Sequence, residues 1–214
     1  MIETFDQILV ETLLIAREEK KSIIEVEYKY NSTLKKDLFE IENLNSIHKG
    51  IKEFYYEITD GFEVNWEKDN DGFIGGKMRL TQSEYLFSEN NSIYDDGDDE
   101  DLKYFRPLDY PTPESYVGFI ITPDTVDESL YYMSISDYEL NNLDLDYEGY
   151  TQMAVEARVF NHWQRVLLYY MDGEGIGSVE TEIFKTEMPK IFPDWTWENF
   201  IAKFESLRLS NKDK

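Results

Sequence analysis

The chain contains no cysteine among its 214 residues. A disulfide framework, a thiolate metal centre and a cysteine nucleophile are therefore excluded. Histidine is also scarce, because only His48 and His162 are present, and the chain has no Gly-x-Ser-x-Gly sequence. These shortages disfavour hydrolases that pair a serine nucleophile with a histidine base.

Long apolar runs are missing as well. The chain begins Met1-Ile2-Glu3, without the basic start of a signal peptide, and the apolar run from Leu13 to Ala16 is too short for a membrane span. We therefore expect a soluble, cytoplasmic protein with no membrane partner. Apolar residues still make up 41% of the chain and aromatic residues 15%, which is enough to build a core and excludes a wholly disordered chain.

Positive charge is what the chain lacks most. It has 45 acidic and 21 basic residues, and between Pro107 and Ala157 there are eleven acidic residues and no lysine or arginine. Residues 80–157 carry a net charge of -17, and the other 136 residues carry only -7. Such a surface repels nucleic acid and anionic membranes and attracts a basic protein.

Two interpretations of this acidity remain open. It can serve solubility alone, as surface charge commonly does. It can also form part of a recognition surface, because tyrosine is enriched at protein interfaces and is frequent in the same stretch. The tyrosines concerned are Tyr110, Tyr116, Tyr131, Tyr132, Tyr138, Tyr147 and Tyr150.

Hydrophobic periodicity predicts helices at both ends of the chain with strands between them. Helices are expected at about 2–20, 34–44, 47–61 and 146–170, and in a C-terminal helical tail at about 179–214 that includes an amphipathic helix from Trp197 to Leu209. Strands are expected at 24–28, 116–121 and 130–135, with a hairpin formed by 62–66 and 77–80, and a mobile acidic loop at 89–101. The pattern indicates an α+β fold with a largely antiparallel sheet flanked by helices. Trp66, Phe119 and Trp163 lie on the apolar phase of their elements and are expected in the core.

Several short segments occur in a recognisable order along residues 33–170. They are a helix with Ile51, Phe54 and Tyr55, a turn at Asp60-Gly61-Phe62, strands through Trp66 and after Gly75-Gly76, the segment from Tyr104 to Asp109, the strand from Tyr116 to Ile121, and a late helix that carries Tyr150 and ends near His162-Trp163-Gln164. This order resembles the SUKH superfamily of Smi/Knr-like proteins.

The resemblance implies a largely antiparallel α+β domain without catalytic residues. Many bacterial members of the superfamily are immunity proteins that bind and neutralise toxin domains, and fungal relatives regulate cell-wall synthesis through protein contacts. We therefore expect a single SUKH-like domain over residues 1–214, in which the N-terminal helix and the C-terminal tail are additions.

Two local patterns suggest ligand sites but fit them poorly. Residues 67–72 place acids at alternate positions before a glycine, yet an EF-hand loop needs aspartate first and glutamate last, where Glu67 and Met78 stand, so a plain turn is favoured over calcium. Residues 173–178 have glycines two apart, but they follow a helix where a dinucleotide-binding motif follows a strand. We interpret them as a helix-ending loop, and we predict no catalytic residue, cofactor or metal.

The leading hypothesis is a non-catalytic immunity protein that binds a basic partner, such as a toxin domain, and not nucleic acid. The acidic residues expected to steer the partner are Asp95, Asp96, Asp98, Asp99, Glu100 and Asp101, and the candidate aromatic anchors are Tyr110, Tyr131, Tyr132 and Tyr138. Two alternatives stay open: a carboxylate-dependent hydrolase whose acids are hidden among 45, and a general regulatory adaptor.

Overall fold

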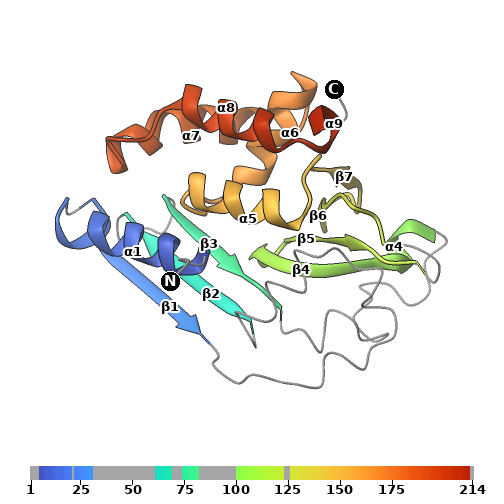
Figure 1. Cartoon of the computed structure of the whole chain (residues 1–214), viewed down its shortest axis with the longest axis horizontal. Helices are drawn as coiled ribbons and strands as arrows, with labels where there is room; N and C mark the ends of the chain where they lie inside the picture. Colours follow the sequence, from blue (N-terminus) through green and yellow to red (C-terminus); the bar gives the residue numbers. More distant parts are fainter. Residues whose placement is uncertain are drawn as a thin grey trace. The chain divides into compact units, whose positions relative to one another are not determined.

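The computed structural model describes residues 5–20, 22–30, 61–68, 74–81, 100–122 and 126–212. These residues form two antiparallel sheets and seven helices, so the predicted α+β class is confirmed. In chain order the elements are α1 (Phe5–Glu18), β1 (Glu25–Tyr30), β2 (Phe62–Glu67), β3 (Gly75–Arg79), α4 (Glu100–Tyr104), β4 (Phe105–Thr112), β5 (Ser115–Ile120), β6 (Tyr131–Ser134), β7 (Leu140–Asn142), α5 (Tyr147–Glu156), α6 (Trp163–Asp172), α7 (Ser178–Ile191), α8 (Trp197–Leu207) and α9 (Leu209–Lys212) (Figure 1). The helices predicted at 34–44 and 47–61 lie outside the described residues.

The chain divides into two compact units. Unit 1 consists of Met1–Tyr28, Val64–Met78 and Gly149–Lys214, and unit 2 consists of Lys29–Glu63 and Arg79–Glu148. Each unit is therefore built from segments that are far apart in the sequence.

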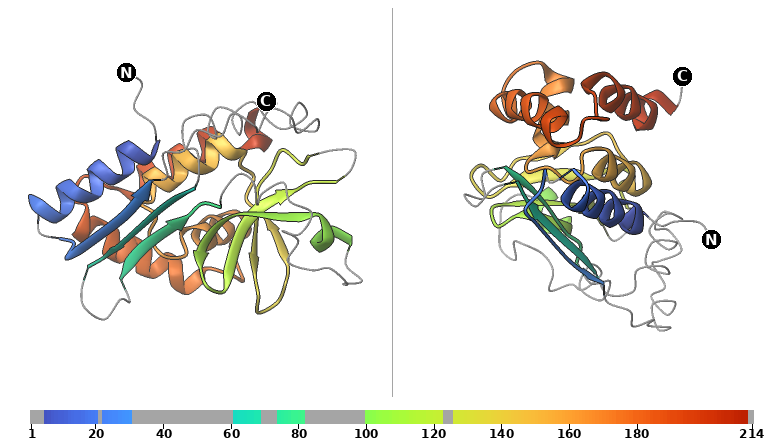
Figure 2. Two further views of the ribbon diagram at one scale, coloured as in Figure 1. Left: turned by 90° about the horizontal axis from the view of Figure 1, so that it is seen from below. Right: turned by 90° about the vertical axis from the view of Figure 1, so that its left-hand side faces the viewer.

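Unit 1 combines α1 with most of a three-stranded sheet in the order β1-β2-β3. Leu9, Leu13 and Ala16 of α1 are buried at helical spacing, as predicted, and the helix runs along the sheet (Figure 2). Strands β2 and β3 form the predicted hairpin, in which the Lys68 N–H donates to the Ile74 carbonyl at 2.9 Å. The strand predicted at 24–28 is also present, as β1.

Trp66 of β2 lies at the centre of the core of unit 1. Its side chain is fully buried, and its ring packs against Phe160 and Phe192 with centroid distances of 6.1 and 5.7 Å. Its indole Nε1 donates a hydrogen bond of 2.7 Å to the Arg158 carbonyl. Trp163 is buried as well, so both core predictions for this unit are confirmed.

The helical pattern predicted at 146–170 is confirmed by α5 and α6, but it is not one continuous helix, because residues 157–162 separate the two. Arg158, Val159 and His162 have positive φ angles of 51°, 48° and 63°, a conformation that residues other than glycine rarely adopt. The break is held by strand β3, since the Lys77 N–H donates to the Val159 carbonyl at 2.9 Å. Tertiary hydrogen bonds thus override the helical pattern of the sequence.

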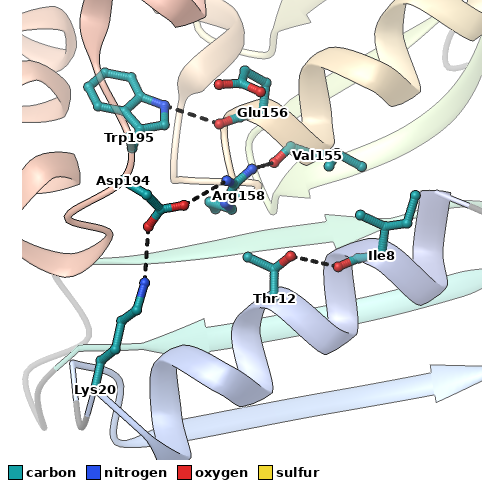
Figure 3. Close-up of polar contacts among 8 residues, drawn as sticks. All are labelled: Ile8, Thr12, Lys20, Val155, Glu156, Arg158, Asp194 and Trp195. Atoms are coloured by element: carbon teal, nitrogen blue, oxygen red, sulfur yellow. Dashed lines mark hydrogen bonds and ion pairs between the residues drawn. The ribbon is translucent and has the colours of Figure 1, made fainter.

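Charged side chains tie the end of α5 to other segments of unit 1 (Figure 3). Asp194 accepts a hydrogen bond of 3.0 Å from Lys20, and its second oxygen lies 4.0 Å from the Arg158 guanidinium. The hydrogen bond from Lys20 is the main reason that the pKa of Asp194 is lowered. The Trp195 indole donates to the Glu156 carbonyl at 3.1 Å in the same region. The charges of Lys20, Arg158 and Asp194 are thus paired with one another within unit 1.

The predicted helical tail forms three helices, α7, α8 and α9. The loop before α7 begins at Gly173, which caps α6 with φ 76°, and ends at Gly177 with φ 98°. The glycines are therefore used for left-handed turns at helix ends, which confirms the predicted helix-ending loop.

Unit 2 contains the four-stranded sheet, in the order β4-β5-β6-β7. Strand β4 includes Pro107 and Pro111, and its pairing with β5 shifts register after Pro107 and again after Asp109. Phe119 of β5 is fully buried, as predicted. Val117, Phe119 and Tyr132 are buried on one face of this sheet, which we call the core face, and the other face carries the candidate site.

Candidate functional site

The strand register places three side chains side by side on the face of the four-stranded sheet that is opposite Val117, Phe119 and Tyr132. Tyr116 of β5 pairs with Met133 of β6, which pairs with Leu140 of β7. Directly opposed residues of antiparallel strands project from the same face. We call Tyr110, Tyr116 and Tyr131 the tyrosine row, because Tyr110 contacts Tyr116 and Tyr131 shares this face.

The tyrosine row rests on a small apolar cluster. Leu102 of α4, Phe105 of β4 and Met133 are buried together, and Tyr116 and Tyr131 pack against them while remaining half-buried. The rings of Tyr110 and Tyr116 meet edge to face at a centroid distance of 5.3 Å. A surface with a packed apolar floor and partly exposed tyrosines is typical of the central part of a protein interface.

Polar contacts hold Tyr131 in place. Its hydroxyl donates to Asp127 Oδ2 at 2.6 Å, and the second oxygen of that carboxylate accepts the Ser129 N–H at 3.0 Å. The Ser129 hydroxyl in turn donates to the Asn142 side chain. Tyr131 therefore presents only part of its ring, and its hydroxyl group is already used within the unit.

Exposed carboxylates stand at the end of the sheet next to Tyr116. Glu114 lies in the β4–β5 turn, and Asp137 and Glu139 lie in the β6–β7 turn. The two turns are neighbours, since the Ile135 N–H donates to the Glu114 carbonyl at 3.0 Å. We call these three residues the acidic tip. Within the described part of the chain, no lysine or arginine forms an ion pair with them.

The β6–β7 turn also presents an aromatic side chain in a costly conformation. Tyr138 is 39% exposed and has φ 58°. A left-handed conformation costs an ordinary residue roughly 1–2 kcal/mol, and asparagine or glycine would fit the turn better. A strained, exposed tyrosine beside the acidic tip fits a surface kept for contact with a partner.

The structure revises the predicted anchor residues. Tyr132 is only 2% exposed, because it pairs with Val117 on the core face of the sheet, so it cannot present its ring to a partner. Tyr110 and Tyr131 are half-buried and Tyr138 is exposed. Tyr116 was missed as an anchor, although its alternation with the buried Ser115 and Val117 in β5 could have indicated the same face.

Most of the predicted steering acids lie outside the described residues, namely Asp95, Asp96, Asp98 and Asp99. Glu100 and Asp101 begin the short helix α4, where a continuous loop had been predicted. The acidic tip was not singled out from the sequence, because only the pairing of four strands brings its two turns together.

Two carboxylates are buried among the described residues, Asp6 in unit 1 and Asp109 in unit 2. Asp109 Oδ1 accepts the Arg79 N–H at 2.8 Å, and Leu80 pairs with Asp109 in an isolated bridge. This carboxylate thus binds the last residue of β3. It has no second buried carboxylate beside it within the described part of its unit, as a pair for glycoside hydrolysis would require.

His162 caps the N-terminus of α6 without a side-chain hydrogen bond to the helix, and its Nδ1 is buried and has no hydrogen-bond partner among the described residues. Burial is the main cause of its lowered pKa, while Glu180 opposes this shift and Arg165 reinforces it. The folded protein therefore favours the neutral imidazole.

We expect His162 to make stability depend on pH. The unfolded chain takes up the histidine proton near pH 6.5, before the folded chain does, so stability should fall as the pH is lowered from about 7 to 5.5. His162→Asn keeps a residue that tolerates a positive φ but does not titrate, so this variant should lose less stability over the same range. Urea unfolding at several pH values measures the difference. Equal losses in both proteins would contradict this role of His162.

The turn predicted at residues 67–72 lies largely outside the described residues, because 69–72 are not among them. No helix in the described ranges is long and apolar enough to cross a membrane.

Comparison of the chain with protein-family models, curated proteins and solved structures finds no match. The SUKH resemblance therefore stays a prediction that rests on the segments quoted above.

Proposed function

We propose that the chain is a non-catalytic binding module that recognises a basic protein through the acidic tip and the tyrosine row of unit 2. In line with the SUKH resemblance, we propose that the partner is a toxin domain that the chain neutralises. One observation carries the proposal: three exposed carboxylates, which form no ion pair with a lysine or arginine among the described residues, adjoin a row of half-exposed tyrosines that rests on a packed floor.

The two parts of this surface supply different contributions to binding. Like charges gathered at one place raise the rate at which an oppositely charged partner arrives, and this effect weakens as salt is added. Tyrosine rings that are already fixed by packing give contact area at a low entropic cost. Charge thus governs association, and the tyrosine row governs how long the complex lasts.

The distribution of charge within the chain also favours unit 2. The described residues 100–122 and 126–148 contain eleven acidic residues against Lys103 and Arg106, whereas residues 163–212 of unit 1 contain eight acidic and six basic residues. Several of those basic residues are paired, as in the Arg165–Glu180 contact of 2.7 Å. A basic partner would therefore be drawn to unit 2.

The test begins with capture of the partner by the tagged full chain from the organism that encodes it, followed by association kinetics at several salt concentrations. A tip variant, Glu114→Gln/Asp137→Asn/Glu139→Gln, is compared with a control that removes three exposed carboxylates from unit 1, Glu174→Gln/Glu182→Gln/Glu198→Gln. Both variants change the net charge equally. We expect a basic partner, slower association for the tip variant and a much smaller change for the control.

Three results would overturn the proposal. The first is a captured partner that is itself acidic. The second is association that does not respond to salt. The third is an equal loss of association rate in the tip variant and the control, which would mean that only the total charge of the chain matters and that its acidity serves solubility.

A further inference from the structure

Basic residues of unit 2 lie over tyrosine rings. The Arg79 guanidinium carbon is 5.9 Å from the centroid of the Tyr110 ring, and Lys103 Nζ is 5.6 Å from that of Tyr104. Arg79 is exposed and forms no ion pair within the described part of the chain. Contacts of this kind are attractive because the face of an aromatic ring carries partial negative charge.

Tyr116 is the neighbour of Tyr110 in the tyrosine row, and no such cation lies over it in the described part of unit 2. It meets Tyr110 edge to face and is half-exposed, and among the described residues no lysine or arginine lies over its ring. Its position is fixed by the strand register and by the packed floor beneath it. The ring is therefore held ready for contact.

The acidic tip supplies counter-charge beside this ring. Glu114 is two residues before Tyr116 in the chain. Glu139 directly precedes Leu140, and Leu140 is aligned with Tyr116 across the sheet because both pair with Met133. A guanidinium group can lie against an aromatic ring and donate two parallel hydrogen bonds to a carboxylate at the same time. An ammonium group is a compact, strongly hydrated charge and does this less well.

We propose that Tyr116 receives an arginine side chain of the basic partner. The guanidinium lies against the Tyr116 ring, as Arg79 lies over Tyr110, and donates hydrogen bonds to a carboxylate of the acidic tip. This inference rests on the proposed function and makes it more specific. It predicts that the contact segment of the partner contains arginine in preference to lysine.

The test uses two unstructured peptides of equal length and charge, one of alternating glycine and arginine and one of alternating glycine and lysine. Calorimetry at low salt gives the affinity of the full-length chain for each. We expect the arginine peptide to bind at least about threefold more tightly, because only the guanidinium can lie against the ring and donate two parallel hydrogen bonds to a carboxylate at the same time. Tyr116→Leu keeps an apolar side chain on the packed floor and should abolish this preference, whereas Tyr116→Phe should keep it.

Tyr170→Leu serves as the control, since Tyr170 is a partly exposed tyrosine of unit 1, at 38%. It should leave both affinities unchanged. Equal binding of the two peptides to the unmodified chain, or a preference for arginine that survives in Tyr116→Leu, would overturn the inference and leave the proposed function standing. Failure of both peptides to bind at low salt would count against the inference and the proposed function together.

Discussion

Replacing Trp66 with alanine should lower the free energy of unfolding by about 3–5 kcal/mol, which is typical of removing a large aromatic side chain from a core. The ring is fully buried between Phe160 and Phe192, so its loss leaves a cavity. The substitution also leaves the Arg158 carbonyl without its indole donor, at a residue with a positive φ. Urea unfolding followed by circular dichroism measures the effect.

Two further variants separate the causes of this loss. Trp66→Phe keeps an aromatic ring but removes the hydrogen bond, so its cost should be clearly smaller than that of Trp66→Ala. Trp197→Ala removes a tryptophan that is only half-buried and should cost less as well. A loss below about 1 kcal/mol for Trp66→Ala would show that Trp66 is not at the centre of the core of unit 1.

Gly177→Ala should also be strongly destabilising. We expect it to lower the free energy of unfolding by about 3 kcal/mol or more, since it combines overpacking with backbone strain. An added Cβ would overlap the Arg165 carbonyl oxygen and lie 3.1 Å from the Tyr169 Cβ, and the residue has φ 98°. The alanine would therefore push α7 away from α6.

Gly173→Ala is the matched comparison, because Gly173 lies in the same loop with φ 76° and a Cβ there would meet nothing within 4 Å. It should show only the cost of the left-handed conformation, about 1 kcal/mol. Thermal and urea unfolding of both variants give the difference. If the two variants lose the same stability, the close approach at Gly177 is not what requires glycine.

The elements predicted correctly from the sequence are those whose pattern depends on local spacing. Helix α1 and the β2–β3 hairpin follow from the period of their apolar residues, and the burial of Trp66 follows from the alternation along β2. Strand β4 was not predicted, because Pro107 and Pro111 obscure its pattern and its irregular pairing with β5 accommodates them. The break between α5 and α6 contains neither glycine nor proline and depends on hydrogen bonds from β3, which no local pattern contains.

The candidate site was only partly predictable for the same reason. The absence of basic residues from 107 to 157 drew attention to this part of the chain, and Tyr110, Tyr131 and Tyr138 were named from it as candidate anchors. Which tyrosines face outward depends on the strand register, and this register places Tyr132 on the core face and Tyr116 on the other. The acidic tip exists only once the two turns are brought together by strand pairing.

The most direct test of the central claim is hydrogen–deuterium exchange of the full chain, measured alone and in complex with its captured partner. Binding at the acidic tip and the tyrosine row predicts slower exchange in the two turns of unit 2, at residues 112–116 and 134–140, and unchanged exchange in helices α6 to α8. Peptides that cover residues 95–101 would show in the same experiment whether the acidic run named for steering is contacted. Protection confined to α6, α7 or α8, with the two turns unaffected, would contradict the claim that unit 2 carries the recognition surface.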